Sequence, residues 1–200
     1  MAQPYRTGKQ YADQAKDPKY DSLKYSDVDC QAFCELVLKD IGVRKPNGAI
    51  YNWKGSNDIA RNACSWIGTI DEYRKQFGEL PLGCWVFKWD NTGNEQQRGY
   101  YDGLGNYSHI GIYIGKGLVR DSTKISNKRD GVGTRSINDF QRVGLAKMLD
   151  FDGTEPYNKN DEIEALIKTY YPNALVIHKK DLQGKNRMTF AIEGDFDEVK

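Results

Sequence analysis

The 200-residue sequence has few cysteines, few histidines and no excess of charge of either sign. Lys and Arg number 29 and Asp and Glu number 28, so the net charge of +1 gives no electrostatic reason to expect a nucleic acid as partner. No uncharged apolar run approaches the about 18 residues that a membrane span needs, and the first residues form no apolar signal segment. We therefore expect a protein made in the cytoplasm, without a membrane span.

The scarcity of cysteine and histidine also limits the metal chemistry. Cys30, Cys34, Cys64 and Cys84 include no Cys-x-x-Cys pair, and only two histidines accompany them. That spacing argues against a structural zinc site. Disulfides are the less expected fate of these thiols in a reducing compartment. The sequence therefore predicts neither a metal nor a cofactor.

Length and composition indicate one ordinary globular domain with a small addition. Hydrophobic residues make up 38% and charged residues 28% of the chain, and 200 residues can bury one full core. We expect a polar, tyrosine-rich N-terminal arm on the surface at 1–24, a main domain at 25–151 and a C-terminal extension of unknown role at 152–200. Within the extension, the pattern predicts a short helix at 161–171 and strands at 174–177 and 188–192.

Within the main domain, the spacing of apolar residues predicts a mixture of helices and strands, and so an α+β fold. A capping box that starts at Ser26 predicts the beginning of a helix, and Gly42 its end. The other expected elements are helices at 57–66 and 70–77, strands at 84–89 and 142–148, a hairpin of 109–114 with 118–121, and loops at 44–58, 90–108 and 124–136.

Among the four cysteines, Cys30 has the position of a reactive thiol. It lies at the start of the first predicted helix, where unpaired amides and the helix dipole favour a thiolate. Cys34 lies one turn later on the apolar stripe of the same helix, which is typical of a core residue. The sequence thus favours Cys30 as a nucleophile.

A nucleophilic thiol needs a base within hydrogen-bond reach. His109 opens a predicted strand directly after a long polar loop, which is a position at the rim of a sheet. The hairpin then returns either Asp121 or Ser122 alongside it, and a shift of one residue in register exchanges the two. We favour Asp121 as the residue that orients His109, because a carboxylate would also stabilise the imidazolium.

Three segments resemble the NlpC-type family of papain-like cell-wall cysteine peptidases. Residues 29–33, Asp-Cys-Gln-Ala-Phe, resemble the family's Asp-Cys-Ser-Gly-Phe. Residues 82–87, Leu-Gly-Cys-Trp-Val-Phe, resemble its Pro-Gly-Asp-Leu-Val-Phe, and residues 109–115, His-Ile-Gly-Ile-Tyr-Ile-Gly, resemble its His-Val-Gly-Ile-Tyr-Leu-Gly. A third polar residue commonly follows that histidine by twelve positions, which is Asp121 here. The similarity spans about residues 25–148.

This resemblance implies a papain-like α+β fold in which the nucleophile helix packs on an antiparallel β-sheet, with the extension as a small appendage. It implies hydrolysis of the γ-D-glutamyl bond to the diamino acid in peptidoglycan stem peptides. In that scheme Cys30 attacks, His109 transfers the proton and Asp121 orients His109, with no metal or cofactor. The expected substrate-binding residues are Tyr25, Asp29, Ser56 and Asn57. The last two also fit an ordinary Asx turn and helix cap.

The sequence departs from the family at several of these positions. Gln31 and Ala32 replace the serine and glycine that follow the nucleophile, Cys84 replaces an aspartate, and an acid stands where histidine is more usual. Wall-lytic chemistry without a signal peptide suggests a bacteriophage or prophage endolysin that acts on the wall after release. The alternatives are an amidase or acyltransferase for a substrate outside the wall, and an inactive wall-binding module. The oligomeric state is left open.

Overall fold

The computed structural model describes residues 6–91, 100, 102–126 and 128–151, together with the backbone of 175–180 and 186–191. The chain divides into two compact units, Met1–Thr154 and Glu155–Lys200. The division lies close to the predicted start of the C-terminal extension at residue 152.

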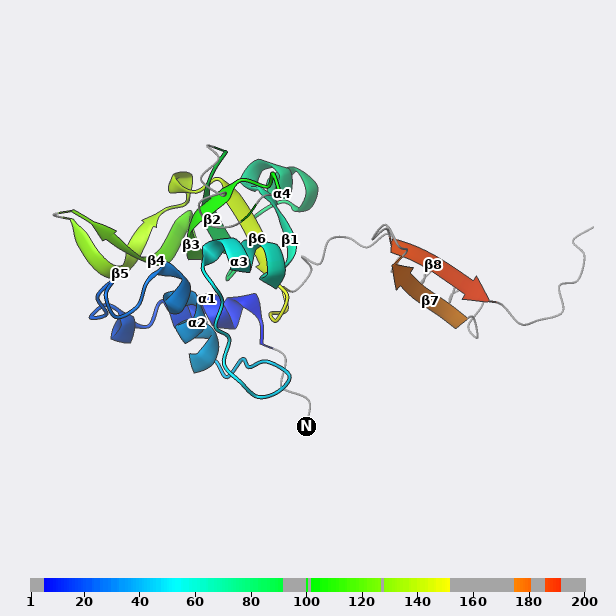
Figure 1. The fold of residues 1–200 in the computed structure, drawn as a ribbon, viewed down its shortest axis with the longest axis horizontal. Helices are drawn as coiled ribbons and strands as arrows, with labels where there is room; N and C mark the ends of the chain where they lie inside the picture. Colours follow the sequence, from blue (N-terminus) through cyan, green and yellow to red (C-terminus); the bar gives the residue numbers. More distant parts are fainter. Residues whose placement is uncertain are drawn as a thin grey trace, which may run out of the picture. The chain divides into compact units, whose positions relative to one another are not determined.

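The first unit is built on a six-stranded antiparallel sheet with the strand order β1-β6-β2-β3-β4-β5 (Figure 1). Its strands are β1 (Cys64–Thr69), β2 (Trp85–Asp90), β3 (Asn106–Gly115), β4 (Leu118–Ile125), β5 (Arg129–Ser136) and β6 (Arg142–Ala146). The chain therefore forms the predicted hairpin of β3 and β4 near the middle of the sheet.

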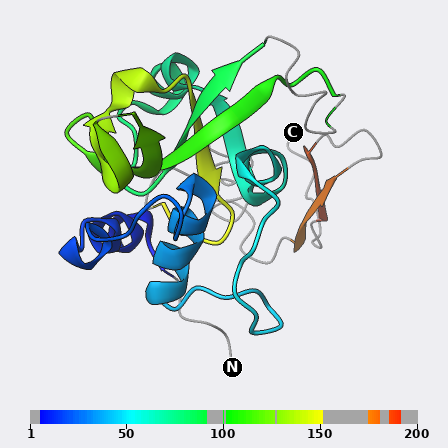
Figure 2. The same cartoon turned by 60° about the vertical axis from the view of Figure 1, so that its left-hand side comes forward.

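Helices pack against this sheet. They are α1 (Gly8–Ala15), α2 (Cys30–Asp40), α3 (Ser56–Asp58), which continues into the π-helical turn η2 (Ile59–Ala63), and α4 (Ile70–Phe77), with short 3-10 turns η1 (Pro18–Tyr20) and η4 (Ile137–Asp139). Helices α1 and α2 contact each other and β3, and they lie side by side in both views (Figure 2), whereas α4 contacts β1 and β6. The predicted α+β class, with the Cys30 helix packed on an antiparallel sheet, is thus confirmed.

The N-terminal segment, expected as a surface arm, instead supplies a helix to the core. Tyr11 of α1 is 0% exposed. Its hydroxyl donates to the carbonyl of Cys34 at 2.9 Å and accepts from Nε1 of Trp85 at 3.2 Å. The expectation was wrong because the face that α1 buries holds glycine, alanine and tyrosine but no aliphatic stripe that would reveal it.

Helix α2 begins three residues later than the sequence suggested. Its N-cap is Asp29, not Ser26, because Oδ1 of Asp29 accepts the backbone N–H of Ala32 at 2.8 Å. The predicted apolar stripe is correct, since Phe33 and its neighbours along the stripe are buried, and Gly42 follows the helix end with a φ of 81°. The later start makes Cys30 the first helical residue.

Two strands were missed. The helix expected at 57–66 ends at Ala63, and β1 follows it directly. The loop expected at 124–136 is largely β5, which pairs with β4 from Ser136 opposite Leu118 to Arg129 opposite Ile125. Its sequence, Arg-Asp-Gly-Val-Gly-Thr-Arg-Ser, lacks the apolar alternation of a typical strand, so pairing with β4 rather than local pattern decides its structure.

The second unit contains an antiparallel pair of strands, β7 (Leu175–Lys180) and β8 (Asn186–Ala191). Leu175 lies opposite Ala191, and the register continues without a shift to Lys180 opposite Asn186. Both strands predicted in the extension are therefore present within one to three residues of the expected bounds. The helix predicted at 161–171 lies outside the described residues.

Candidate functional site

Cys30 lies where the N-terminus of α2 meets β3. It is 9% exposed, and the backbone amides of Ile110 and of Gln31 act on its sulfur as hydrogen-bond donors. Among the described residues, the backbone pairing of β3 with β4 begins at Ile112, opposite Arg120, and does not extend to Ile110. The two strands thus separate beside Ile110, whose amide is available to the sulfur. The structure places Cys30 against the residue that follows His109.

His109 and Asp121 form a close pair across β3 and β4. Nε2 of His109 lies 2.5 Å from Oδ2 of Asp121, and the histidine side chain is 11% exposed while that of Asp121 is 0% exposed. The ring of Phe140 stacks on His109 with centroids 6.2 Å apart. Because Nε2 is engaged by the carboxylate, Nδ1 is the nitrogen left to exchange a proton with a thiol.

The hairpin register decides between Asp121 and Ser122. Adjacent residues of a strand point to opposite faces of the sheet. Ser122 accordingly faces the other way, and its hydroxyl donates to the carbonyl of Val28 at 2.5 Å, just before α2. Of the two candidates, the structure brings Asp121 to His109, whereas Ser122 links β4 to the segment just before α2.

Gly111 provides the space for this pair. A Cβ atom at Gly111 would lie 2.5 Å from Cγ1 of Val119 and 3.1 Å from Cβ of Asp121. Any side chain at this position would therefore push against the strand that carries Asp121. A glycine between His109 and Ile112 lets the carboxylate approach the imidazole.

Two arginines of β5 complete the surroundings of Asp121. Nη2 of Arg129 donates to Oδ1 at 2.6 Å, and Nε of Arg135 lies 3.0 Å from Oδ2. Burial alone would raise the pKa of Asp121, but the hydrogen bond from His109 and the charges of His109, Arg129 and Arg135 outweigh it and hold that pKa below its usual value. Asp121 is thus an ionised carboxylate in the interior of the protein.

The electrostatics of Cys30 differ from the simple expectation of an activated thiolate. Burial is the largest influence and raises the pKa of Cys30 to about 11, while the Ile110 and Gln31 amides lower it in part. The Gln31 amide at the helix start therefore favours the thiolate, as predicted, and the Ile110 amide of β3 acts in the same direction, but burial outweighs both. The resting side chain is a thiol, so attack on a carbonyl requires a base to remove its proton.

Gln31, which departs from the family pattern, anchors the loop beside Cys30. Its Nε2 donates to the carbonyl of Trp53 at 2.5 Å and to Oε1 of Glu35 at 2.8 Å. Oε1 of Glu35 also accepts the backbone N–H of Trp53 at 2.5 Å. Both hydrogens on Nε2 of Gln31 are thus donated within the protein, so this side chain cannot also hold an oxyanion next to the sulfur.

The four residues expected to bind substrate fall into two groups. Asp29 and Tyr25 lie on the surface at the approach to α2; Asp29 caps the helix, and the backbone amide of Tyr25 bonds to Oδ1 of Asp130 at 3.3 Å. Ser56 and Asn57 are 8% and 6% exposed. Their hydrogen bonds are internal, so they serve as structural anchors and the expectation of direct substrate contact does not fit them.

Ser56 and Asn57 hold the beginning of β3. The hydroxyl of Ser56 donates to the carbonyl of Tyr107 at 2.5 Å, and Oδ1 of Asn57 accepts the backbone N–H of Tyr107 at 3.0 Å. Nδ2 of Asn57 donates to Oδ1 of Asn106 at 2.9 Å. Since Tyr107 precedes His109 by two residues, these bonds determine where the histidine strand starts.

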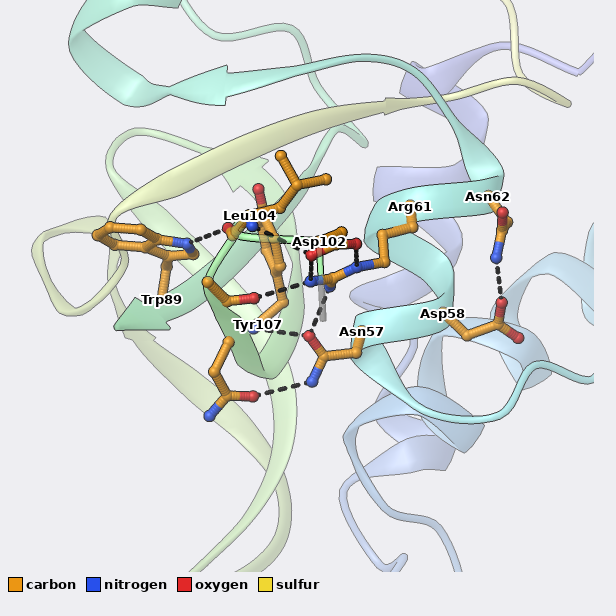
Figure 3. A network of polar contacts seen from close by, with 10 residues as sticks. Asn57, Asp58, Arg61, Asn62, Trp89, Asp102, Leu104 and Tyr107 are labelled. Atoms are coloured by element: carbon orange, nitrogen blue, oxygen red, sulfur yellow. Dashed lines mark hydrogen bonds and ion pairs between the residues drawn. The ribbon is translucent and has the colours of Figure 1, made fainter. Parts of the chain in front are cut away.

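Arg61 extends this anchor and was not recognised from the sequence. Figure 3 shows Arg61 and Asn57 projecting together toward the segment of Asp102 and Tyr107. Arg61 makes a two-point ion pair with Asp102 at 2.6 and 2.9 Å, and donates to Oδ1 of Asn57 at 2.8 Å and to the carbonyl of Gly105 at 2.9 Å. The four-residue spacing of Asn57 and Arg61 on one helical face was the available signal.

Comparison of the chain with family models, with curated proteins and with solved structures found no match. None of the described helices is long and apolar enough to cross a membrane. Within the described part of the chain, no group of three or more His, Cys, Asp or Glu side chains is arranged to hold a metal ion. All four cysteines are free thiols.

Proposed function

We propose that the chain is an NlpC-type, papain-like cysteine peptidase that hydrolyses amide bonds in peptidoglycan stem peptides. The observation that carries the proposal is the 2.5 Å pair of His109 and Asp121 on strands directly beside Cys30 at the start of α2. The sequence resemblance around Cys30 and His109 supplies the substrate class, namely the γ-D-glutamyl bond to the diamino acid. The proposal includes action on the wall as a phage-type lysin.

The proposed reaction uses the thiol in its neutral resting form. His109 takes the proton of Cys30 through Nδ1 as the sulfur attacks the amide carbonyl, and Asp121 stabilises the imidazolium through Nε2. The imidazolium then gives that proton to the leaving amine, which leaves a thioester on Cys30. Water, deprotonated by His109, hydrolyses the thioester and releases the acid. The backbone amide of Cys30, the first residue of α2, is suited to hold the oxyanion, because an amide in the first turn has no partner within the helix.

Purified peptidoglycan tests this proposal. The full chain should release a new free amine on the diamino acid, and Cys30→Ser should lower that rate by about 10³-fold or more while leaving the fold intact. Cys64→Ser is the matched control, because Cys64 is also a free thiol but lies on β1. Equal activity of the wild type and Cys30→Ser would refute the proposed nucleophile.

Two other functions remain as outcomes of the same experiment. An acyltransferase forms the same thioester but resolves it with an amine, so a product that joins an added amine to the stem peptide would identify it. The burial of Cys30 and its pKa of about 11 favour, as the second candidate, a domain that binds wall peptides without cleaving them. Binding of stem peptide by both wild type and Cys30→Ser, with no product from either, would identify that function.

A further inference from the structure

The carboxylate of Asp121 has more cationic partners than orientation of one histidine requires. Its side chain is 0% exposed, and three positively charged or chargeable groups lie within 3.0 Å of its two oxygens. Oδ1 takes the hydrogen bond from Nη2 of Arg129. Oδ2 takes both the bond from Nε2 of His109 and the ion pair with Nε of Arg135.

The two arginines contact the carboxylate in different ways. Arg129 makes an aligned hydrogen bond of 2.6 Å. Nε of Arg135 is buried and close enough for an ion pair, but it has no hydrogen-bond partner among the described residues. Its guanidinium also lies over the ring of Phe140, 5.7 Å from the centroid, and that ring stacks on His109. Arg135 thus adds positive charge beside Oδ2 without replacing the bond from His109.

The fold supports both side chains from one strand. Asp121 lies opposite Gly133 in the β4–β5 register, and Arg135 and Arg129 lie two and four residues away from Gly133 along β5, on the same face. Gly133 has no side chain, and a Cβ there would lie 2.5 Å from Nη1 of Arg129. A larger residue at 133 would therefore displace Arg129 from the carboxylate.

From this geometry we infer that Arg129 and Arg135 are positioning residues for the His109–Asp121 pair: Arg129 fixes the carboxylate through Oδ1, and Arg135 withdraws negative charge from the oxygen that holds His109. The inference rests on the proposed function for its consequence. A carboxylate that shares its charge with two guanidiniums stabilises an imidazolium less, so His109 returns its proton to the leaving amine more readily.

Other charged groups around His109 do not duplicate this arrangement. Lys88 of β2 stands directly opposite His109 in the β2–β3 register, and Cys30 of α2 lies against the next residue of β3. Cys30 is neutral in its resting form because burial raises its pKa to about 11. Lys88 adds a positive charge on the side of the histidine away from β4. Asp121 is the one acid bonded to His109 among the described residues.

An NMR titration of the histidine ring in the full chain tests the inference without substrate. The chain has only two histidines, so a His178→Gln variant assigns the His109 signal. Arg135→Met should raise the pKa of His109 by about one unit, because it removes a positive charge next to the shared oxygen. Lys124→Met is the matched control, since it removes one positive charge from an exposed position of β4 and should move that pKa by about 0.2 units or less.

Two further variants distinguish an effect of the arginines on His109 from a contribution to folding alone. Arg135→Lys keeps the charge in a more flexible side chain, and should give a smaller rise than Arg135→Met in a protein that still folds. Arg129→Met removes the hydrogen bond that fixes Oδ1 of Asp121, so the carboxylate should lose its orientation toward His109 and the Nε2-bound proton should shift upfield. If Arg135→Met lowers the melting temperature but leaves the pKa of His109 unchanged, Arg135 is only structural and the inference is wrong. If Arg135→Met fails to fold, Arg135→Gln, which also removes the charge but keeps a polar side chain, takes its place, and an unchanged pKa in that variant refutes the inference.

These outcomes stay separate from those of the proposed function. The pKa shift is measured on the free protein, so it can appear even if peptidoglycan is not cleaved. Conversely, an unchanged pKa would overturn the role of the arginines while leaving amine release from peptidoglycan unaffected. Where both hold, the low-pH limb of kcat/KM should move upward in Arg135→Met by the same amount as the histidine pKa.

Discussion

At the scale of single residues, Cys30 is subject to two opposing influences. Burial raises its pKa, while the amides of Ile110 and Gln31 lower it, and the balance is a pKa of about 11. Burial raises the pKa of Cys64 further, to about 12, and holds those of Cys34 and Cys84 well above the usual value. Cys30 is thus the thiol that the protein most favours as a thiolate, although it remains protonated near neutral pH.

We expect iodoacetamide to alkylate Cys30 first. The reactive species is the thiolate, and a raised pKa means that the thiolate fraction, and with it the rate, increases about tenfold per pH unit from pH 7 until the pH nears 11. Peptide mapping after brief labelling should find Cys30 modified before Cys64, and Cys34 and Cys84 only after unfolding. Labelling of all four at one slow rate would show that Cys30 has no special environment.

At the scale of helices and strands, α1 and the α3–η2 segment hold the elements of the site from two sides. Tyr11 links α1 to the carbonyl of Cys34 in α2 and to Trp85 in β2. Asn57 and Arg61 link the α3–η2 segment to the start of β3. The thiol helix and the histidine strand are therefore each fixed by a neighbour that contributes no reacting group.

Tyr11→Phe should destabilise the protein by about 1–3 kcal/mol. The substitution keeps the ring but leaves Nε1 of Trp85 without its hydrogen-bond acceptor and removes the bond that Tyr11 adds to the carbonyl of Cys34. Urea unfolding followed by tryptophan fluorescence measures the change. Tyr25→Phe, at a residue that is 36% exposed, is the control and should change stability by less than about 0.5 kcal/mol. An equal, small effect of both would mean that α1 is the surface arm suggested by the sequence.

Arg61→Lys should lower kcat clearly while changing the free energy of unfolding little. Lysine keeps the charge but cannot reach Asp102, Asn57 and Gly105 at once, so the segment before His109 loses its two-point ion pair. We expect a fall of about tenfold or more in amine release, since small displacements of a catalytic group are costly. Lys54→Met, on the exposed loop before α3, is the control. Normal activity of Arg61→Lys would show that this anchor does not position His109.

Sequence patterns predicted the helices and strands whose apolar residues recur at a regular spacing. They missed the strands that form because they pair with a neighbouring strand. The helix 70–77 and the strand that carries His109 have capping or alternating residues that signal them locally. Strand β5 does not, because one of its faces carries two arginines and two glycines in place of apolar residues. Both arginines contact Asp121. Hairpin spacing left Asp121 or Ser122 as the partner of His109, and the chemistry of a carboxylate favoured Asp121. The roles of Arg61, Arg129 and Arg135 depend on contacts between distant segments.

At the scale of the whole molecule, the first unit has the features of a self-sufficient domain. Every residue of the described hydrophobic core lies between Tyr11 and Phe151, and the six-stranded sheet is complete within this range. The core includes residues from α1, so the N-terminal segment belongs to the domain. A two-stranded sheet such as β7–β8 is by contrast marginal when alone in water.

We therefore expect a chain that ends at Thr154 to fold and to carry out the proposed reaction. Its melting temperature should stay within the few degrees that about 1 kcal/mol represents for a domain of this size. Comparing rates on intact peptidoglycan and on soluble stem peptides then reveals what residues 155–200 contribute. If the truncated and full chains cleave soluble peptides at equal rates but the truncated chain is slower on intact wall, the second unit binds the wall. Only the polymeric substrate offers a second contact that raises the affinity of the full chain. An unfolded truncated chain would show instead that the first unit depends on the second for stability.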